Sequence, residues 1–311
     1  MDKVWDVLII GSGPASFTCA IYVARGAAST LILAGESWGG QLMLTTKVDN
    51  FPGFPDGIDG PELMNNMRKQ AERFGAEIIN KAVTKVDFAK TPFEVFVGEK
   101  KYLAKAVVIA TGAQNVWLEV PGEKELIGRG VSTCAPCDAP FFKGKVVAVV
   151  GGGDTAMEEA SVLTKYASKV YLIHRRDTFR ASSAMQDKVT KDPNIKIIWN
   201  TEVTKINGET KVESLNLRNN KTNKTSELKL DGVFIAIGHK PESDLFKGQV
   251  EMDEKGYILP KNWHCGTNVN GVFLAGDVMD KHFKQAVVSA GMGCIAALEV
   301  LKYLDQLGVD K

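Results

Sequence analysis

Residues 6–16 read D-V-L-I-I-G-S-G-P-A-S, and this stretch has the pattern of a strand, a glycine-rich turn and the start of a helix. Its first part, Asp6–Ile10, predicts a buried strand, and the turn that follows opens a helix running to about Gly26. The turn has the pattern G-x-G-x-x-S from Gly11 to Ser16. Glycines in such a turn let the backbone approach a pyrophosphate, which the N-terminus of the helix attracts. The stretch therefore predicts a dinucleotide-binding unit; a tight turn in another α/β fold is the alternative.

The same theme recurs in the second half of the chain. Val146–Val150 predicts a strand, and the turn Gly151–Ala156, with the pattern G-x-G-x-x-A, opens a helix that extends to about Ala167. Each unit continues into another predicted strand, Thr30–Leu33 in the first and Lys169–Ile173 in the second. The sequence thus predicts an α/β fold with two dinucleotide-binding, Rossmann-like domains.

The order of the remaining elements predicts that one domain is inserted into the other. Further strands are expected at Ala106–Ala110, Gly232–Ile237 and Gly271–Ala275, and a long helix from about Lys284 to Leu307. Segments rich in breakers or polar residues near 112–117 and 238–244 are expected to be hinges. We therefore expect a split outer domain formed by residues 1–117 and 245–311, and an inserted domain at residues 118–244.

The bulk composition agrees with a chain of this kind. At 311 residues the chain is too long for one ordinary core and suits two domains. The net charge of +1 gives no global field toward nucleic acid or membrane, and neither is expected as a partner. The N-terminal residues lack a signal-peptide pattern, and no apolar run is expected to approach the ~20 residues that span a bilayer.

The five cysteines include one close pair, Cys134 and Cys137. The other three, Cys19, Cys265 and Cys294, are scattered singly and are expected to be packing residues. An odd number argues against a secreted disulfide framework, so we expect a reducing compartment, the cytosol. In that compartment the close pair is expected to be redox-active.

The run C-A-P-C-D from Cys134 to Asp138 carries the predicted chemistry. Two intervening residues permit a disulfide within one helical turn and allow a lowered thiol pKa at a helix N-terminus. The neighbouring acid is expected to serve the thiolate chemistry. Half of a zinc site, completed by His264 and Cys265, and a pair of buried structural cysteines are the alternatives. No metal is expected.

The residues near the second glycine turn indicate which nucleotide it binds more clearly than those near the first. Its second strand ends in His174-Arg175-Arg176, and Arg180 follows. An enzyme that prefers NADH usually has an acidic residue there to accept hydrogen bonds from ribose hydroxyls. Guanidinium groups instead favour the 2′-phosphate of NADPH. The pattern predicts an NADPH site, and a solvated basic loop is the alternative.

The ligand of the first unit is less sharply defined by its own residues. Glu36 lies about where an acid binds a ribose, but an exposed loop acid is an equal alternative. Asp277 ends a strand, and the run from Lys284 to Ala286 opens a helix after a short loop. This arrangement suits a sugar-like chain and an electron-accepting ring. From spacing alone, a structural role for Asp277 as a buried residue at the end of a strand is an equal alternative.

Several separate motifs follow one another along essentially the full length of the chain. They are G-S-G-P-A at 11–15, G-G-Q at 39–41, D-N-F-P-G-F at 49–54, A-T-G-A at 110–113, C-A-P-C-D at 134–138, G-G-G-D-T-A at 151–156, H-R-R-D-x-F-R at 174–180, A-I-G at 236–238 and A-G-D at 275–277. In this order the chain resembles the low-molecular-weight thioredoxin reductases, which are NADPH-dependent flavoprotein disulfide reductases.

The resemblance implies FAD in the outer domain, NADPH in the inserted domain, and a set of cofactor-binding positions in each. In the outer domain these positions are Gly11, Ser12, Gly13, Pro14, Ala15, Gly40, Gln41, Asn50, Val83, Thr111, Gly112, Gly276, Asp277, Lys284, Gln285 and Ala286. In the inserted domain they are Gly151, Gly153, Asp154, Thr155, His174, Arg175, Arg176, Arg180, Ile237 and Gly238.

The resemblance also implies the reaction of a thioredoxin-disulfide reductase, in which electrons pass from NADPH to FAD, to the cysteine pair and to oxidised thioredoxin. Carried over from the family, Cys137 exchanges electrons with FAD, Cys134 forms the mixed disulfide and Asp138 is the acid. A thioredoxin-like partner, a homodimer and a cytoplasmic location are expected. Because the NADPH motif and the cysteines share one domain, yet both must reach one flavin, that domain is expected to rotate on its hinges.

Some positions depart from the family pattern. Pro136 stands inside the cysteine pair, Ala139-Pro140 stands where glycine is common, and Lys284 replaces a common arginine. These changes affect redox poise and partner fit. The alternative function is a related flavin-dependent oxidoreductase with a different dithiol or disulfide partner or electron donor. From another class, a non-catalytic dinucleotide sensor is the rival.

Overall fold

The computed structural model describes residues 3–261 and 265–309, which form two compact units. The outer unit consists of Met1–Gln114 and Lys240–Lys311, and the inserted unit is Asn115–His239. The sequence predicts the two boundaries at 117/118 and 244/245, whereas the structure places them three and five residues earlier (117 − 114 and 244 − 239). The chain passes between the units through two short strands that pair with each other, β9 (Ala113–Asn115) and β18 (His239–Pro241).

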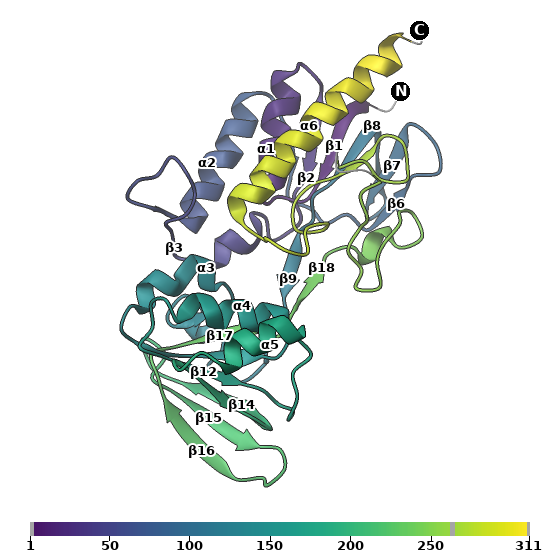
Figure 1. Ribbon diagram of the computed structural model, residues 1–311. Coiled ribbons are helices and arrows are strands. Elements are labelled where there is room, and N and C mark those ends of the chain that lie inside the picture. The colour runs from purple at the N-terminus through teal and green to yellow at the C-terminus, as the bar shows by residue number, and fades with distance from the viewer. Residues whose placement is uncertain (1–2, 262–264, 310–311) are drawn as a thin grey trace. The chain divides into compact units, whose positions relative to one another are not determined.

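The outer unit contains a seven-stranded sheet in the order β5-β2-β1-β8-β7-β6, with β19 pairing β8 (Figure 1). Its strands are β1 (Val4–Ile10), β2 (Thr30–Leu33), β5 (Glu77–Ile79), β6 (Lys85–Asp87), β7 (Phe93–Val97), β8 (Lys100–Ile109) and β19 (Val272–Leu274). Strands β5, β2, β1, β8 and β19 are parallel, whereas β6 and β7 pair in antiparallel fashion beside β8. A parallel core of this kind requires cover on both faces.

The alternation of side chains along β1 supplies the two cores of the outer unit. Val7 and Ile9 pack in one core with helices α1 (Pro14–Arg25), α2 (Gly60–Arg73) and α6 (Ala286–Val309). Leu8 and Ile10 point to the other face, where they pack with residues of β6–β8 and the short helix η4 (Asp244–Phe246). Figure 1 shows α1, α2 and α6 lying side by side along the sheet. Smaller elements are β3 (Lys47–Val48), β4 (Ile58–Asp59) and η1 (Gly40–Leu44).

The inserted unit repeats this plan with a five-stranded parallel sheet in the order β10-β17-β11-β12-β13. The strands are β10 (Val131–Ser132), β11 (Val146–Gly151), β12 (Lys169–Ile173), β13 (Ile195–Ile198) and β17 (Gly232–Ala236). The helices are α3 (Ala135–Asp138), α4 (Asp154–Leu163) and α5 (Ser183–Thr190), with η2 (Lys124–Leu126) and η3 (Ala139–Phe142). The unit also has an antiparallel sheet of β14 (Thr201–Asn207), β15 (Ser214–Asn219) and β16 (Thr225–Lys229).

Alternating residues of β11 again separate two cores. Val147 and Val149 pack with α3, α4 and α5, whereas Ala148 and Val150 pack with the antiparallel sheet β14–β16. Both predicted strand–turn–helix–strand units are therefore present, and the expected α/β class is confirmed. The second helix ends at Leu163 instead of near Ala167, because the chain turns there and the Tyr166 carbonyl accepts a hydrogen bond from the Gly144 backbone N–H at 2.8 Å.

Helix α6 differs from the expectation that no apolar run is long enough to cross a bilayer. Its residues Ala286–Gly308 reach a mean hydropathy of 1.6 and pass that test by length and composition. The apolar residues are spread around the helix among small residues, so the helix passes by composition without one unbroken apolar run. One side of the helix, with Ala296, Ala297 and Val300, is buried against the outer unit's core. Such a core helix meets the same criteria as a membrane span.

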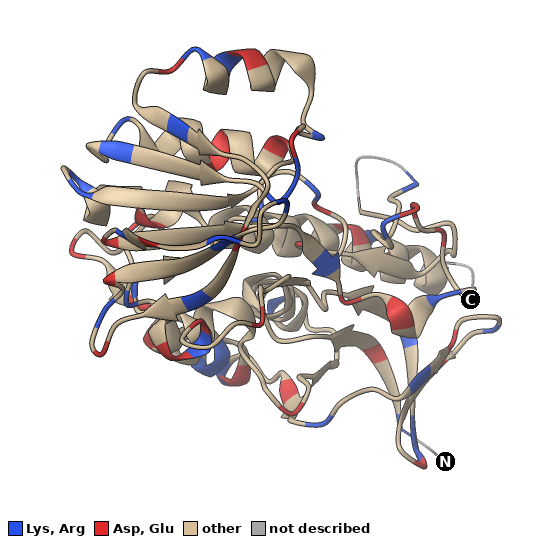
Figure 2. Ribbon diagram, turned by 90° about the horizontal axis from the view of Figure 1, so that it is seen from below, with Lys and Arg blue, Asp and Glu red and all other residues tan. Residues whose placement is uncertain are grey.

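Lys and Arg positions alternate with Asp and Glu positions along the ribbon (Figure 2). The chain has 38 Lys and Arg residues against 37 Asp and Glu residues, so neither sign dominates. Overall charge therefore indicates no binding partner, and function depends on local groups of residues.

Candidate active site

The first glycine of each dinucleotide-type turn is required by close packing. A Cβ added at Gly11 would lie 2.2 Å from the carbonyl oxygen of Ala110, and one at Gly151 would lie 2.3 Å from that of Ala236. Gly11 also has φ +121°, a conformation that side-chain-bearing residues rarely adopt. At each site the turn crosses the end of the neighbouring strand too closely for any side chain.

The second glycine of each turn faces open space. A Cβ at Gly13 or Gly153 would have no neighbouring atom within 4 Å. Each glycine is the N-cap of a helix, α1 or α4, and neither helix has a side-chain hydrogen bond at its cap. A helix N-terminus beside open space suits a phosphate group, and a side chain here would fill that space. Both turns therefore fit a bound dinucleotide.

This difference predicts opposite outcomes for two substitutions in the second turn. Gly153→Ala is expected to fold normally, because its φ of −101° is open to any residue and the Cβ meets nothing. It should nevertheless raise the KM for NADPH roughly tenfold or more, equivalent to ~1.4 kcal/mol of binding. Gly151→Ala is the matched contrast and should lose about 1–3 kcal/mol of stability through overpacking. Thermal unfolding and NADPH kinetics on both variants check this; an unaltered KM in Gly153→Ala would contradict it.

Around the first turn, Ser12 fixes the neighbouring loop. Its hydroxyl donates to the Ala34 carbonyl oxygen at 2.7 Å and accepts from the Gly39 backbone N–H at 3.0 Å. A Cβ at Gly40 would lie 3.5 Å from the Cα of Gly13. The predicted residues of the G-G-Q motif are thus held directly beside the open side of the turn, with Gln41 exposed in η1.

The N-terminus of α6 is brought to the same turn. A Cβ at Gly293 would lie 2.2 Å from the Ala15 carbonyl oxygen, so glycine permits close crossing of α6 and α1. The Asn50 side-chain amide donates to Gln285 Oε1 at 3.3 Å. The Ser289 hydroxyl donates to Asp277 Oδ1 at 2.8 Å. Residues predicted from three distant motifs are therefore grouped at one end of the outer sheet.

Burial governs the charge of Asp277. Its half-buried carboxyl has a raised pKa, chiefly because of desolvation, although the Ser289 hydrogen bond opposes this shift. A carboxyl group in this position can hydrogen-bond a hydroxyl-bearing ligand chain. This geometry suits the role that the sequence predicts for Asp277.

Asp280 is a residue of this region that the sequence did not single out. It is buried, and its carboxylate accepts backbone N–H groups of His282, Phe283 and Lys284 at 2.8–3.2 Å. The loop that it organises includes Lys284 at φ +47° and leads directly into Gln285. The signal in the sequence is an Asp followed by residues that can turn back onto its side chain.

Other predicted positions of the outer unit lie nearby or at its edge. Thr111 Oγ1 donates to the Glu242 carbonyl oxygen at 2.5 Å, and the Glu242 N–H donates to the Gly112 carbonyl oxygen at 2.9 Å. These bonds tie the two predicted hinge segments together. Val83 is half-buried in the loop after β5, and Glu36 is exposed after β2 without a structural feature that assigns it a ligand.

In the inserted unit, the second glycine turn and the arginine loop are held together by hydrogen bonds. Asp154 Oδ1 accepts from the Ser182 backbone N–H at 2.8 Å and from its hydroxyl at 2.9 Å. The Arg180 backbone N–H donates to the Gly152 carbonyl oxygen at 2.8 Å. Asp154 therefore anchors the loop beside the turn, and Thr155 follows it in the first turn of α4.

His174 is buried, unlike the arginines that follow it. Its Nε2 lies 3.0 Å from the Thr178 carbonyl oxygen, and its ring centroid lies 5.3 Å from that of Phe179. A Cβ at Gly152 would lie 2.2 Å from the imidazole ring. Burial lowers the pKa of His174, so the neutral form is favoured. The structure packs this histidine beneath the loop that carries the arginines.

The three guanidinium-bearing residues, Arg175, Arg176 and Arg180, are exposed on this loop. Among the described residues, no ion pair within 4.0 Å uses any of the three. The adjacent Asp177 pairs instead with Lys221 at 2.6 Å, which holds the pKa of that carboxyl below its usual value. The loop therefore presents positive charge beside the glycine turn. At the end of β17, the half-buried Ile237 precedes Gly238, whose φ is +127°.

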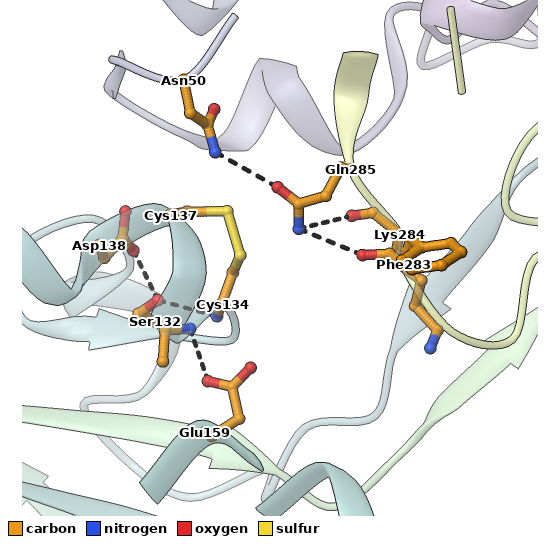
Figure 3. Close-up of a disulfide and its surroundings, with 10 residues drawn as sticks. Asn50, Ser132, Cys134, Cys137, Asp138, Glu159, Phe283, Lys284 and Gln285 are labelled. Atoms are coloured by element: carbon orange, nitrogen blue, oxygen red, sulfur yellow. Dashed lines mark hydrogen bonds between the residues drawn. A yellow bond between two sulfur atoms is a disulfide. The ribbon is translucent and has the colours of Figure 1, made fainter. Parts of the chain in front are cut away.

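The inserted unit also carries a disulfide between Cys134 and Cys137, with sulfur atoms 2.09 Å and Cα atoms 5.3 Å apart (Figure 3). Cys134 is the N-cap of the short helix α3, and Cys137 lies in its single turn. Both residues are half-buried. The structure thus confirms the predicted disulfide.

The backbone N–H groups of the turn that holds the disulfide form hydrogen bonds within the protein. The Ala135 N–H donates to Glu159 Oε2 at 2.6 Å, and Pro136 has no N–H. The Cys137 N–H donates to the Cys134 carbonyl oxygen at 3.2 Å. Glu159, a buried residue of α4, was missed because the contact joins positions 24 apart in sequence.

Asp138 lies in the same turn as the disulfide. Its Oδ2 accepts a hydrogen bond from the Ser132 hydroxyl at 2.5 Å, and Ser132 Oγ accepts from the Cys134 N–H at 3.1 Å (Figure 3). Desolvation raises the pKa of Asp138, and the Ser132 hydrogen bond opposes part of this rise. A carboxyl group that stays protonated to higher pH suits an acid in disulfide exchange.

The remaining cysteines are poorly suited to redox chemistry. Cys19 and Cys265 are buried, and burial raises the pKa of Cys265 to about 11. Cys294 is half-buried on α6. Residues 3–261 and 265–309 contain no cluster of three His, Cys, Asp or Glu side chains arranged to hold a metal ion. His264, proposed as an alternative zinc ligand, lies outside the described residues.

Comparison with known proteins places these groups of residues in a known family. The pyridine nucleotide-disulphide oxidoreductase family matches residues 5–293. A thioredoxin reductase of Streptomyces clavuligerus is 51% identical and covers 99% of this chain and 96% of its own length. One from Rickettsia felis is 49% identical, with 98% of this chain and 100% of the relative covered.

Solved structures extend the comparison. A thioredoxin reductase from Giardia duodenalis superimposes with a TM-score of 0.94 at 43% identity, covering 98% of this chain and 100% of that one. One from Lactococcus lactis, described as an FR conformation, has a TM-score of 0.65 at 38% identity, covering 97% and 99%. The paired glycine turns, the arginine loop and the Cys134–Cys137 disulfide are thus found in a chain that belongs to the pyridine nucleotide-disulphide oxidoreductase family, among its thioredoxin reductases.

Proposed function

We propose that this chain is an NADPH-dependent thioredoxin-disulfide reductase that uses FAD. The observation that carries the proposal is the Cys134–Cys137 disulfide, which lies with the half-buried acid Asp138 in a unit that also presents a glycine turn and an arginine loop. A dinucleotide sensor needs neither the disulfide nor the acid. A reductase needs both.

The open sides of the two turns support the assignment of the cofactors. Gly13 and the N-terminus of α6 would hold FAD in the outer unit, and Gly153 with the arginine loop would hold NADPH in the inserted unit. When bound, the flavin supplies two-electron transfer from the nicotinamide to the disulfide. The remaining steps belong to side chains of this chain.

The reduced cysteines perform the exchange with thioredoxin. The Cys134 thiolate attacks one sulfur of the thioredoxin disulfide, forms a mixed disulfide and releases the other sulfur as a thiolate. Asp138 supplies a proton to that thiolate. The Cys137 thiolate then attacks Cys134 Sγ, which releases the second thioredoxin sulfur and restores the Cys134–Cys137 disulfide. Two electrons leave this chain, and the thioredoxin disulfide becomes one thiol and one thiolate, which takes its proton from water.

Asp138→Asn is expected to slow turnover about 10²- to 10⁴-fold, the usual contribution of a general acid. Because burial raises the Asp138 pKa, the wild-type acid stays protonated to higher pH than an ordinary Asp, and activity should fall as pH rises through that pKa. Asparagine cannot titrate, so this limb should disappear from the pH profile. A pH–rate series with saturating thioredoxin measures both effects, and an unchanged limb would contradict the assignment.

Rotation of the inserted unit is part of the proposal, because that unit carries both the disulfide and the arginine loop. The paired strands β9 and β18 are the connection about which it would turn. Solved thioredoxin reductases from Streptococcus pyogenes and Lactococcus lactis are 39% and 38% identical to this chain, yet their TM-scores are 0.94 and 0.65. Such a spread at equal identity is expected when family members adopt more than one arrangement of their units.

We also propose a cytoplasmic homodimer formed through α6. Val287, Ile295 and Leu298 recur at helical spacing and are 41%, 42% and 47% exposed, and Tyr22 of α1 is 43% exposed. An apolar stripe of this kind on a helix whose other side is buried suits a second copy of the chain. The same burial places α6 in the core of the outer unit and argues against a membrane span.

Replacing Ile295 and Leu298 together by glutamate is expected to convert the dimer to a monomer. Four like charges would meet across a two-fold interface, which costs several kcal/mol. Sedimentation or light scattering gives the mass directly. The matched control is Leu307→Glu near the end of α6, which adds charge at an exposed position beyond the stripe. A wild-type monomer, or an unaltered dimer in the double variant, would contradict this surface.

The proposed reaction is tested by coupling NADPH oxidation to the appearance of thioredoxin thiols. Equal molar NADPH consumption and thioredoxin reduction supports the proposal. Oxidation of NADPH with an unreduced thioredoxin but a reduced small disulfide would favour the alternative, a related flavin enzyme with another partner. Failure to oxidise NADPH with any disulfide would contradict the enzyme class.

A further inference from the structure

We propose that Ser132 is a positioning residue that orients the Asp138 carboxyl group and places its transferable proton on Oδ1. The inference rests on the proposed thioredoxin reductase reaction, in which Asp138 is the acid. It concerns a residue that neither the sequence motifs nor the cofactor turns required. The residue ends β10, immediately before the redox turn.

The hydrogen bonds of Ser132 direct its hydroxyl proton toward Asp138. The Cys134 N–H donates to Ser132 Oγ at 3.1 Å, and the Ser132 hydroxyl donates to Asp138 Oδ2 at 2.5 Å. Ser132 is 8% exposed, so water competes little for either bond. One buried side chain therefore connects the backbone of the attacking cysteine to the acid.

This connection determines which carboxyl oxygen can carry the proton. Oδ2 already accepts the serine proton, so a proton on Asp138 is favoured on Oδ1. The serine also fixes the carboxyl rotation, because its own position is fixed by the Cys134 N–H. Asp138 can then give up the Oδ1 proton and keep the same hydrogen bond to Oδ2 as a carboxylate.

Few other groups in the inserted unit compete for Asp138. Helix α4 packs against α3 and contributes Glu159, whose carboxylate accepts from the Ala135 N–H instead. Helix η3, with the sequence A-P-F-F, contributes no titratable side chain. The cysteines of the turn itself are joined in the disulfide. Ser132 is thus the side chain of this unit that hydrogen-bonds the acid in the oxidised state.

Ser132→Ala is expected to have two separable effects. Loss of the donor that stabilises the carboxylate raises the Asp138 pKa, so the high-pH limb of the turnover profile should move toward higher pH. Loss of orientation should lower kcat on the low-pH plateau roughly tenfold, with the KM for NADPH unchanged because the nucleotide loop is untouched. Ser132→Thr retains the hydroxyl and should restore the wild-type limb.

The deciding experiment is a double-mutant cycle on the full-length holoenzyme. Turnover with thioredoxin is measured from acidic to alkaline pH for wild type, Ser132→Ala, Asp138→Asn and the double variant. If Ser132 acts through Asp138, adding Ser132→Ala to Asp138→Asn should change neither the profile nor kcat appreciably. Flavin content and thermal unfolding midpoint show whether each variant is folded.

The possible results separate the inference from the function on which it rests. A wild-type enzyme without NADPH-driven thioredoxin reduction overturns the proposed function. An active wild type whose Ser132→Ala variant keeps the same limb, or loses equally much activity in the Asp138→Asn background, overturns the positioning role alone. If Ser132→Ala does not fold, the limb of Ser132→Thr decides: a wild-type limb supports the role of the hydroxyl, and a shifted one overturns it.

Discussion

Cys134→Ser is expected to lower thioredoxin turnover by a factor on the order of 10⁴–10⁶, as loss of a catalytic nucleophile does. Serine is nearly isosteric with cysteine but is a poor nucleophile near neutral pH, so no mixed disulfide can form. The half-buried site should tolerate the change, and the fold should remain intact. Reduction of the flavin by NADPH should persist, because the glycine turns and the arginine loop are unchanged.

Cys137→Ser is the matched variant that distinguishes the two cysteines. It should also abolish turnover, but it leaves Cys134 free to engage a thioredoxin sulfur without Cys137 to resolve the product. A stable mixed disulfide with thioredoxin should therefore accumulate in Cys137→Ser and not in Cys134→Ser. Non-reducing electrophoresis and mass spectrometry read this directly. Trapping by Cys134→Ser instead would reverse the assigned roles.

Replacing Arg175 and Arg176 together by alanine should raise the KM for NADPH on the order of 100-fold or more. Each hydrogen bond from a charged donor is worth roughly 1.5–3 kcal/mol, and two such donors would be lost. The KM for NADH should change little, since NADH lacks the 2′-phosphate. The ratio of the two kcat/KM values therefore measures the effect.

Arg218→Ala is the control for that double variant. Arg218 belongs to the same unit but is paired with Glu202 on the antiparallel sheet. Its loss removes a positive charge without altering the loop beside the glycine turn, so the preference for NADPH should remain. An equal loss of affinity for NADPH and NADH in the arginine-loop variant would show that the loop does not bind the 2′-phosphate of NADPH.

Much of the fold could be predicted because its signals are local. β2 and β12 have the predicted bounds, and both glycine turns lie where a strand meets a helix. The two glycines of each turn are required for different physical reasons. The first is closely packed, and the second faces open space. Such features depend on a few consecutive residues, so they can be predicted from the sequence alone.

The residues that the sequence missed depend on contacts between separate elements. Glu159 reaches the redox turn from α4, and no spacing within the C-A-P-C run indicates that contact. His174, expected among the cofactor-binding residues, also packs its ring against Phe179 and Trp199, and the motif alone does not indicate these contacts. The exposed stripe on α6 was hidden because its apolar residues resemble those on the buried side.

The central claim is that the disulfide accepts electrons that enter as NADPH. Anaerobic titration of the purified holoenzyme with NADPH, followed by the flavin absorbance, tests it most directly with Cys134→Ser beside the wild type. We expect the wild type to consume more than one NADPH per flavin, the variant to lose this excess, and oxidised thioredoxin to restore the wild-type flavin colour. Equal NADPH uptake by both proteins, or a flavin that NADPH does not bleach, would contradict it.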